Sequence, residues 1–408
     1  MTSIKADIFN GEIKLEELFK AYFDCRKNKR NTINALAFEV DYESRLIELY
    51  SEINRGAYQP GKSVAFIVNY PVKREIFAAD FRDRVVHHLI INKLNSLFEE
   101  NFIYDSYSCR FGKGTSAGVG RLDSFIRRCS KNYSQDCYVL KVDIEGFFMS
   151  IDKNILFEKL KNFINQKYLY TDKLVLLNLC KTVIYNDSTK NCIFKGNISD
   201  WDGLPSNKSL FHSRHNCGLP IGNLTSQIFA NFYLNAFDHF IKNKLAIRFY
   251  GRYVDDCVFV YRSKEYLEYL ISEIKDFLKL ELKLNLHPNK TYLQHYAKGV
   301  KFLGVIIKPN RMYISNRTKG NFYTAIMKQN DIVEKRSPIK EEKDAFLCSM
   351  NSYLGIVRQY KSYRMRVKMI VKYLSYWWWD HIYLDTNVTK FRIKRGKTRQ
   401  NVSHVCWK

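Results

Sequence analysis

The sequence predicts an α+β protein built from two or three subdomains. Its 408 residues exceed what one hydrophobic core usually serves, and 46% hydrophobic with 26% charged residues is typical of a folded globular chain. Short apolar strands arranged as hairpins alternate with longer segments of helical period. This pattern excludes disordered and collagen-like classes and favours antiparallel sheets with packed helices.

The N-terminal part predicts helices followed by a hairpin. Helices are expected over residues 13–26 and about 36–55, and strands over 63–69 and 72–79 meet at Tyr70-Pro71. The next expected elements are a helix over 82–99, a glycine-containing loop over 104–114 and a helix over 116–129.

The central part contains two strands that end in acidic residues. Residues 137–142 predict an apolar strand that ends at Asp143. Strands over 248–253 and 257–262 are separated only by Val254-Asp255-Asp256, which indicates a tight hairpin with acids at its tip. The other expected elements are a helix from about 153, an irregular segment over 186–217, helices over 224–244 and 265–280, a hairpin over 300–307 and 312–315, and helices from 319 onwards.

An excess of basic residues indicates a polyanionic partner. The chain has 66 Lys and Arg against 41 Asp and Glu, a net charge of +25. About half of this excess lies after residue 318, and the segment from Thr386 to Lys408 contains seven basic residues and no acidic one. That tail is expected either to bind nucleic acid or to be a solvated end.

The sequence gives no sign of a membrane or secretory protein. It has no run of 18 apolar residues, and residues 1–10 lack the apolar core of a signal peptide. Its ten scattered Cys residues form no C-x-x-C pair, so we expect free thiols in a reducing cytoplasm. The irregular segment contains Cys192, His212, His215 and Cys217, which leave a zinc site open, although their spacing fits no common ligand pattern.

The acidic strand ends suggest metal chemistry. Asp143, Asp255 and Asp256 would converge if their strands were neighbours in one sheet. Such carboxylates repel one another unless a divalent cation lies among them, and Mg²⁺ binds carboxylates together with substrate phosphates. Two such ions would activate a 3′-hydroxyl and stabilise a pyrophosphate leaving group. The alternative is that Asp-Asp in a hairpin is ordinary turn chemistry.

Tyr253-Val254-Asp255-Asp256 between apolar strands resembles the Y-x-D-D box of reverse transcriptases. Further blocks that resemble this family occur in order between residues 71 and 315. They are the fingers blocks 73–76, 81–84 and 108–115, the first catalytic block 142–148, the block 218–227, the lysine block 285–291 and the primer-grip block 302–304. The resemblance implies an RNA-directed DNA polymerase shaped as a right hand. It would use two Mg²⁺ ions, for which Mn²⁺ can substitute. It assigns N-terminal helices and fingers to 1–135, the palm to 136–317 with an inserted segment over about 153–217, a helical thumb to 318–385 and a basic tail to 386–408.

The block 221–227 points to one branch of the family. Retroviral and group II intron enzymes usually carry Gln-Gly and Ser-Pro here, whereas Ile221-Gly222 and Ser226-Gln227 are similar to the reverse transcriptases of diversity-generating retroelements. Segments 199–205, 208–211, 351–355 and 360–363 resemble the same branch. This implies a bacterial or phage-encoded enzyme that copies a template-repeat RNA into cDNA, with errors at template adenines, to diversify a target gene. The implied partners are template RNA, the RNA/DNA hybrid, dNTPs and an accessory variability determinant protein, a basic oligomer.

The resemblance also assigns roles to single residues. Asp143, Asp255 and the Ile144 carbonyl would hold the metal ions, and Asp256 would be a supporting catalytic carboxylate. The residues assigned to nucleotide binding are Lys73, Arg74, Phe148, Ile221, Gly222, Gln227 and Lys290. Those assigned to nucleic-acid binding are Arg110, Lys113, Gly304, Lys394 and Arg395.

Several of these roles have a specific chemical content. Lys73 and Arg74 would clamp the triphosphate, since Lys offers a point charge and Arg a fork. Phe148 would exclude a ribose 2′-hydroxyl, and Lys290 would act as a general acid for the leaving group. Ile221 replaces a Gln that can hydrogen-bond near the templating pair, which would loosen base selection. The alternative for Phe148, and also for Ile221, is an ordinary core residue, since Phe and Ile are often buried.

Two other functions stay open at this point. One is another bacterial reverse transcriptase, of the retron or abortive-infection type, acting in phage defence. The other is an RNA-binding scaffold without catalysis, against which the three repelling acids argue. Trp377-Trp378-Trp379 is expected to pack in the thumb or to form a partner surface.

Overall fold

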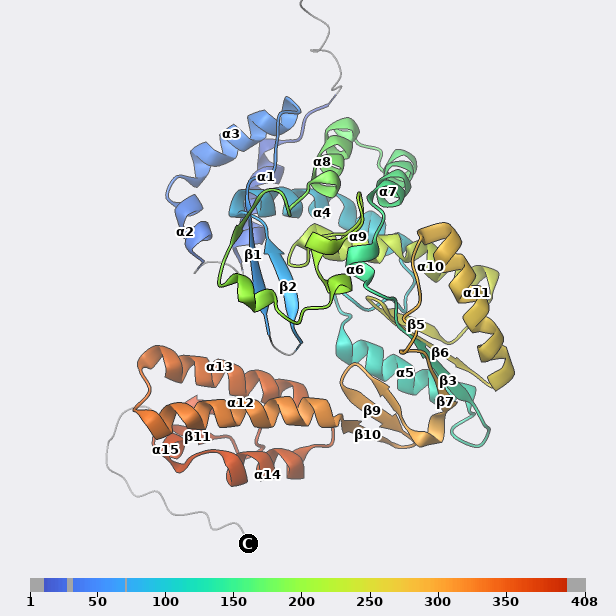
Figure 1. Ribbon diagram of the computed structural model, residues 1–408, viewed down its shortest axis with the longest axis vertical. Coiled ribbons are helices and arrows are strands. Elements are labelled where there is room, and N and C mark those ends of the chain that lie inside the picture. Colours follow the sequence, from blue (N-terminus) through green and yellow to red (C-terminus); the bar gives the residue numbers. More distant parts are fainter. Residues whose placement is uncertain (1–10, 28–31, 70–71, 395–408) are drawn as a thin grey trace, which may run out of the picture. The chain divides into compact units, whose positions relative to one another are not determined.

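The computed structural model describes residues 11–27, 32–69 and 72–394, and the chain divides into two compact units, Met1–His295 and Tyr296–Lys408 (Figure 1). Four helices form the N-terminal part of the first unit: α1 (Leu15–Arg26), α2 (Ile33–Glu39), α3 (Tyr42–Asn54) and α4 (Phe81–Asn101). The single helix predicted over 36–55 is wrong. Asp41 leaves the helical conformation and begins α3 as its N-cap, a position that favours Asp.

A small sheet carries the predicted fingers hairpin. Strands β1 (Ser63–Val68) and β2 (Arg74–Ala78) pair antiparallel, which confirms the hairpin. On the other edge of β1, β4 (Cys192–Phe194) pairs in parallel. The segment 186–217, expected to be irregular, therefore contributes a strand to this sheet, and it also forms three short 3₁₀ helices: η1 (Ile198–Trp201), η2 (Ser206–Lys208) and η3 (Leu210–His212).

The palm sheet has four antiparallel strands in the order β5-β6-β3-β7. They are β3 (Tyr138–Val142), β5 (Tyr250–Tyr253), β6 (Asp256–Tyr261) and β7 (Tyr292–His295). The apolar run 257–260 of β6 is buried, as expected for a central strand covered on both faces. Helices α5 (Thr115–Cys129) and α11 (Lys264–Leu282) pack against the sheet.

The remaining helices of the first unit connect these sheets. They are α6 (Phe147–Ser150), α7 (Lys153–Lys167), α8 (Lys173–Tyr185), α9 (Leu224–Tyr233) and α10 (Asn235–His239), followed by the π-helical turn η4 (Phe240–Lys244). The helix predicted over 224–244 is thus divided into three pieces, with the first break at Leu234.

The second unit combines a three-stranded sheet with a helical bundle. The sheet order is β10-β9-β8, from β8 (Val300–Phe302), β9 (Val305–Lys308) and β10 (Arg311–Ile314). The strand predicted over 300–307 is broken because Leu303 and Gly304 both have positive φ and form a two-residue turn. The helices are α12 (Asn316–Lys335), α13 (Lys340–Val357), α14 (Tyr363–Tyr373) and α15 (Tyr376–Trp379).

The basic tail predicted from residue 386 is partly folded. Strand β12 (Phe391–Ile393) pairs with β11 (Ile382–Leu384), and Phe391 is buried in the core of the second unit. Trp378 lies in that core too, stacked on Phe346, so the expected packing role is confirmed for this tryptophan. Residues 395–408 lie outside the described part of the chain.

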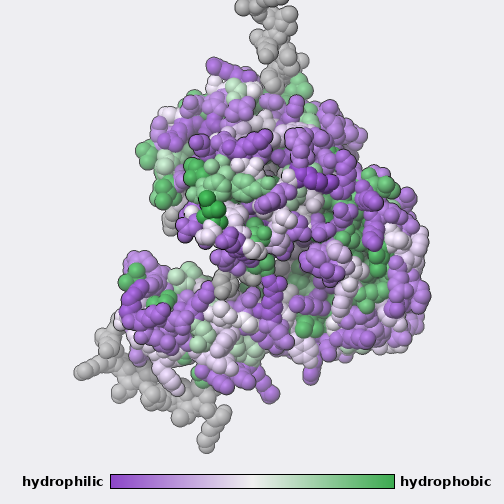
Figure 2. Space-filling model, in the orientation of Figure 1, coloured by the Kyte–Doolittle hydropathy of each residue, from purple (hydrophilic) through white to green (hydrophobic). Residues whose placement is uncertain are grey.

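Hydrophilic residues cover most of the face shown in Figure 2, with smaller hydrophobic areas between them. Within the described residues, no helix combines the length and the apolar character that crossing a lipid bilayer requires.

Candidate active site

The palm sheet brings the three predicted aspartates together. Asp143 follows β3, Asp255 lies in the turn between β5 and β6, and Asp256 begins β6. Because Val142 pairs with Cys257, the register places Asp143 beside Asp256 across the β3–β6 pair. The convergence expected from neighbouring strands is therefore present.

The carboxyl groups interact electrostatically. Desolvation of the half-buried Asp255 carboxyl, followed by the charges of Asp143 and Asp256, raises the pKa of Asp255 to about 7. Two lysines supply nearby positive charge: Lys290 Nζ lies 2.9 Å from Asp143 Oδ1, and Lys141 Nζ lies 3.5 Å from Asp256 Oδ1. Asp255 thus occupies the position where additional positive charge would be most favourable.

The donor set fits Mg²⁺ bound by few protein ligands. The described residues contain no group of three or more His, Cys, Asp and Glu side chains arranged to hold a metal ion. Mg²⁺ is usually bound through one or two carboxylates plus substrate phosphates and water, so a pair such as Asp143 and Asp255 is sufficient. Repulsion within this pair is the cost that a divalent cation would remove.

Backbone pairing positions the lysine block beside the aspartates. His287 N donates to the Asp143 carbonyl (2.8 Å), Glu145 N donates to the Asn285 carbonyl (2.9 Å), and Ile144 forms a bridge with Leu286. The block 285–290 therefore follows the backbone of 143–145, which explains how Lys290 reaches Asp143. The Ile144 side chain is a buried hydrocarbon without donor atoms, so only its backbone carbonyl is a candidate ligand.

The fingers hairpin presents Lys73 and Arg74 differently. Lys73 Nζ donates to the Asp202 carbonyl (2.6 Å) in the inserted segment. Arg74 is exposed at the start of β2. Burial raises the pKa of Tyr253, and the Arg74 guanidinium opposes that shift, so Arg74 lies near the strand that leads into the aspartate turn.

Phe148 and Ile221 pack against the same small core. Its buried residues are Ala65, Phe77, Met149 and Leu210, which come from the fingers sheet, α6 and the inserted segment. Both side chains are only half buried, so part of each surface stays available to a ligand. The structure therefore assigns packing to both residues and leaves their predicted contacts with a nucleotide as predictions.

The block 221–227 connects the hairpin to α9. Phe77 N donates to the Ile221 carbonyl (2.8 Å), and Gly222 has φ +123°. A Cβ at Gly222 would lie 2.9 Å from Ile76 Cγ2, so only glycine fits there without a shift of its neighbour. Gln227 is exposed and accepts a hydrogen bond from the Cys109 thiol (3.2 Å).

Arg110 has a structural role. Its guanidinium binds both oxygens of Glu99 and donates to the carbonyls of Ile103 and Ser106, and only 5% of the side chain is exposed. These contacts occupy most of the guanidinium donors, and the predicted contact of Arg110 with template phosphate stays a prediction. Lys113 lies over the exposed Tyr104 ring, with its Nζ 3.2 Å from the ring centroid, and stays a candidate.

Two predicted nucleic-acid contacts lie in the second unit. Gly304 has φ +83°, and its carbonyl accepts hydrogen bonds from Ser315 N and Thr318 Oγ1 at the start of α12. Lys394 donates to the Trp379 carbonyl (2.6 Å), and its side chain is exposed. Arg395 lies outside the described residues.

The zinc site left open by the sequence does not assemble in the described residues, since no group of three metal-binding side chains forms there. Sequence reasoning missed two buried charged residues near the predicted site, Glu75 and Arg252. Strand period gave a partial signal of their burial. Glu75 lies two residues from the apolar Phe77 and Arg252 two residues from Tyr250, so each points to the same face of its strand as a large ring.

Comparisons with known proteins agree with the geometry. The model of the family "Reverse transcriptase (RNA-dependent DNA polymerase)" matches residues 73–307, more than half of the chain. The putative COX1/OXI3 intron 2 protein of Saccharomyces cerevisiae is 23% identical over 274 residues, which are 58% of this chain and 30% of that protein. Protein YkfC of Escherichia coli is 22% identical over 290 residues, 63% of this chain and 69% of that protein.

Among solved structures, telomerase from Candida tropicalis aligns with a TM-score of 0.48 at 12% identity, covering 78% of this chain and 60% of that one. Telomerase from Candida albicans, in complex with a fragment of telomeric RNA, aligns with a TM-score of 0.46 at 14% identity, covering 84% and 60%. The chain spans less than a third of the yeast relative and little more than half of the telomerase chains. Because the family model matches more than half of its residues, the chain belongs to the reverse transcriptase family.

Proposed function

We propose that the chain is an RNA-directed DNA polymerase that copies a template-repeat RNA into cDNA, with errors concentrated at template adenines, for diversification of a target gene. The observation that carries the polymerase activity is the convergence of Asp143 with the turn that carries Asp255 and Asp256, at one end of the palm sheet of a member of the reverse transcriptase family. The Ile221-Gly222 and Ser226-Gln227 sequence supports the diversity-generating branch.

In the proposed reaction, Asp143, Asp255 and the Ile144 carbonyl would hold two Mg²⁺ ions, for which Mn²⁺ can substitute. When bound, these ions supply activation of the 3′-hydroxyl and stabilisation of the pyrophosphate. Lys290, whose ammonium reaches the Asp143 carboxylate, donates a proton to the leaving group. Arg74 and Lys73 bind the triphosphate, and Phe148 restricts the sugar to deoxyribose.

The substrates and partners belong to the same proposal. They are template RNA, the RNA/DNA hybrid, dNTPs and a basic oligomeric accessory protein. The net charge of +25 supports binding of the two nucleic acids, because basic side chains that neutralise phosphates release counterions.

Primer extension on an RNA template tests the activity. Asp255→Asn should abolish Mg²⁺-dependent extension and keep the fold, since it removes like-charge repulsion at a half-buried site. Asp136→Asn, at the exposed opposite end of β3, is the matched control and should retain activity. Wild-type rates for Asp255→Asn would contradict the metal assignment. A folded wild type that binds RNA without extending any primer would favour the scaffold function.

Fidelity tests the branch. Ile221→Gln should restore a polar contact near the templating pair and lower the error rate about two- to tenfold, the value of one hydrogen bond of about 0.5–1.5 kcal/mol. The decrease should be largest opposite template adenine. Sequencing cDNA copied from one defined RNA measures this, with Ile221→Leu as the control that keeps an apolar side chain. Equal error spectra for wild type and Ile221→Gln would make Ile221 a packing residue only.

A further inference from the structure

The turn that carries Asp255 contains an unfavourable backbone conformation. Tyr253 pairs with Asp256, so Val254 and Asp255 are the two central residues of the turn. Val254 has φ +55°, in the left-handed region that β-branched residues rarely adopt. Such a conformation persists only where surrounding contacts hold it, and it is found preferentially at functional sites.

The contact that holds this turn comes from Arg252. Its side chain is fully buried, and its Nη1 donates to the Val254 carbonyl (2.8 Å). That carbonyl belongs to the peptide group that leads into Asp255. The guanidinium therefore fixes the plane from which the Asp255 side chain departs.

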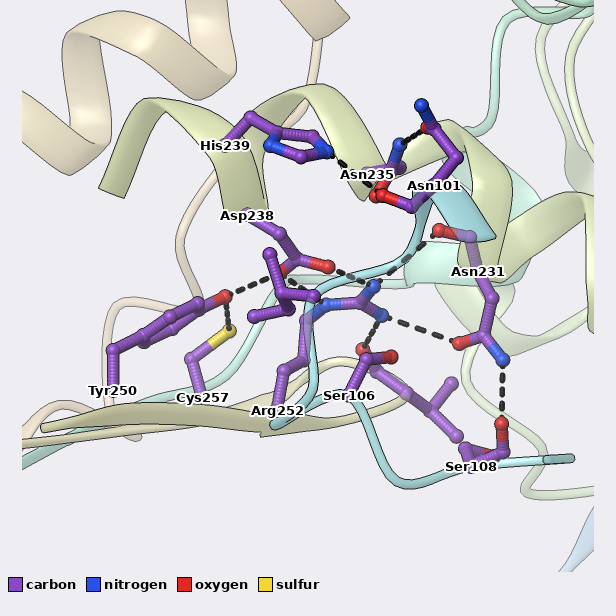
Figure 3. A network of polar contacts seen from close by, with 12 residues as sticks. Asn101, Ser106, Ser108, Asn231, Asn235, Asp238, His239, Tyr250, Arg252 and Cys257 are labelled. Carbon is purple, nitrogen blue, oxygen red and sulfur yellow. Dashed lines mark hydrogen bonds and ion pairs between the residues drawn. The ribbon is translucent and has the colours of Figure 1, made fainter. Parts of the chain in front are cut away.

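The guanidinium is held on its other side by a buried acid, as Figure 3 shows. Arg252 Nε and Nη2 bind the two oxygens of Asp238 (2.8 and 2.6 Å), and the Tyr250 hydroxyl donates to Asp238 Oδ1 (2.6 Å). Asn231 accepts from Nη1 through Oδ1 and from Nη2 through its carbonyl, both at 3.3 Å. Because both sides of the Arg252 guanidinium are hydrogen-bonded, the group is held in one orientation.

Both Asn231 and Arg252 are linked to the fingers segment 105–108. Asn231 Nδ2 donates to the Ser108 carbonyl (2.7 Å), and the Arg252 backbone exchanges hydrogen bonds with Asp105 and Tyr107. The loop is close enough that a Cβ on Gly251 would lie 2.4 Å from the Tyr107 hydroxyl oxygen. Arg252 thus connects the aspartate turn, α9, α10 and the segment 105–108.

We propose that Arg252 is a positioning residue that aligns Asp255 with Asp143 by holding the Val254 carbonyl in its left-handed turn. The inference rests on the proposed function. Arg252 is buried behind the turn, so it acts through Asp255 and contacts neither substrate nor metal. Replacement of a buried ion pair by apolar residues is often tolerated in folding, which makes a role in alignment the better reason for a charge at this position.

Arg252→Lys is the informative variant, because one ammonium cannot bind both Asp238 oxygens and the Val254 carbonyl with the geometry of a planar fork. We expect kcat for primer extension to fall about 10- to 100-fold, as small misplacements of catalytic groups do, with the KM for primer–template within about twofold of wild type. Binding of Mn²⁺, followed by electron paramagnetic resonance without nucleotide, should weaken several-fold.

Arg366→Lys is the matched control, since Arg366 is a buried arginine of the second unit that donates to the carbonyls of Asn387 and Val388. It should lower the melting temperature while keeping kcat and Mn²⁺ binding. Wild-type kcat and Mn²⁺ affinity in folded Arg252→Lys would overturn the proposal, as would equal losses in both variants.

Tyr250→Phe covers the case in which Arg252→Lys does not fold, because it removes one hydrogen bond to Asp238 and keeps the ring. It should lower kcat about two- to fivefold, within the value of a single hydrogen bond, and an unchanged kcat and Mn²⁺ affinity would overturn the proposal. If wild type binds Mn²⁺ but extends no primer, the proposed function fails, and the Mn²⁺ affinities of the variants still decide the role of Arg252.

Discussion

Two buried charges, Arg252 in the palm and Glu75 in the fingers hairpin, are stabilised in different ways. Arg252 is paired with the opposite charge of Asp238 through two hydrogen bonds. The Glu75 carboxylate accepts instead from three uncharged donors of the inserted segment: Trp201 Nε1 (2.7 Å), Ser209 Oγ (2.8 Å) and Leu210 N (2.5 Å). The palm is therefore fixed by a charge-balanced network, whereas the hairpin is fixed by attachment of the insertion.

This difference bears on how each region can respond to substrate. The Arg252 network lies wholly within packed elements of the first unit and fixes one conformation of the aspartate turn. The hairpin depends on a segment that touches it through β4, through Glu75 and through the Lys73–Asp202 contact. Occupation of Lys73 by a triphosphate would break the last of these contacts, so we expect the hairpin and the insertion to respond together.

The largest expected effect comes from neutralising the buried carboxylate in each of the two networks. Asp238→Asn leaves the Arg252 guanidinium buried without its counter-charge and should cost about 3–5 kcal/mol of unfolding free energy. Glu75→Gln keeps the side-chain volume and one acceptor oxygen, but its NH₂ group would face a hydrogen-bond donor. It should lower the free energy of unfolding by about 1–3 kcal/mol. Denaturant unfolding of both variants measures the two values. A larger cost for Glu75→Gln would reverse the comparison.

The second prediction concerns Asp255. Unlike Asp238, its carboxyl has no buried cationic partner among the described contacts. The pKa of Asp255 is raised to about 7 from its ordinary value of 3.8, so the folded state binds its proton more tightly than the unfolded state does. Its contribution to stability is full below pH 3.8 and is lost as the pH rises through 7.

The free energy of unfolding of Asp255→Asn relative to that of wild type should therefore be larger at pH 8 than at pH 5. Urea unfolding of both proteins at the two pH values measures the difference, and Mg²⁺ at pH 8 should reduce it by stabilising the ionised wild type. A difference that does not change with pH would show that the Asp255 carboxyl titrates in its ordinary range.

The smallest expected effect is Trp201→Phe, which removes one of the three donors to Glu75 and keeps an aromatic ring beside Phe194. It should cost about 1 kcal/mol, mostly within the inserted segment. Hydrogen exchange of β4 and of residues 206–212 should become faster, with the palm strands unchanged. Equal acceleration in β3 and β6 would mean that the insertion and the palm form one cooperative unit.

Much of the candidate site could be predicted from the sequence. The strand ending at Asp143 and the hairpin ending at Asp255-Asp256 follow from apolar runs of strand length interrupted by acids, and the structure places them side by side. The breaks of the helix predicted over 36–55 and of the strand predicted over 300–307 were missed, since each depends on the local conformation of one or two residues, Asp41 or Leu303-Gly304.

By itself, the sequence determined which residues are candidates for the chemistry, because strand period and family blocks are local properties that can be read without knowing what each residue contacts. Only the tertiary structure decided what holds them. Glu75 accepts a hydrogen bond from Leu210, 135 residues away, and Arg110 binds Glu99. Whether a charged side chain is exposed to a ligand or buried in a network depends on neighbours distant in sequence, since burial makes every polar group require a partner that only the fold can bring to it.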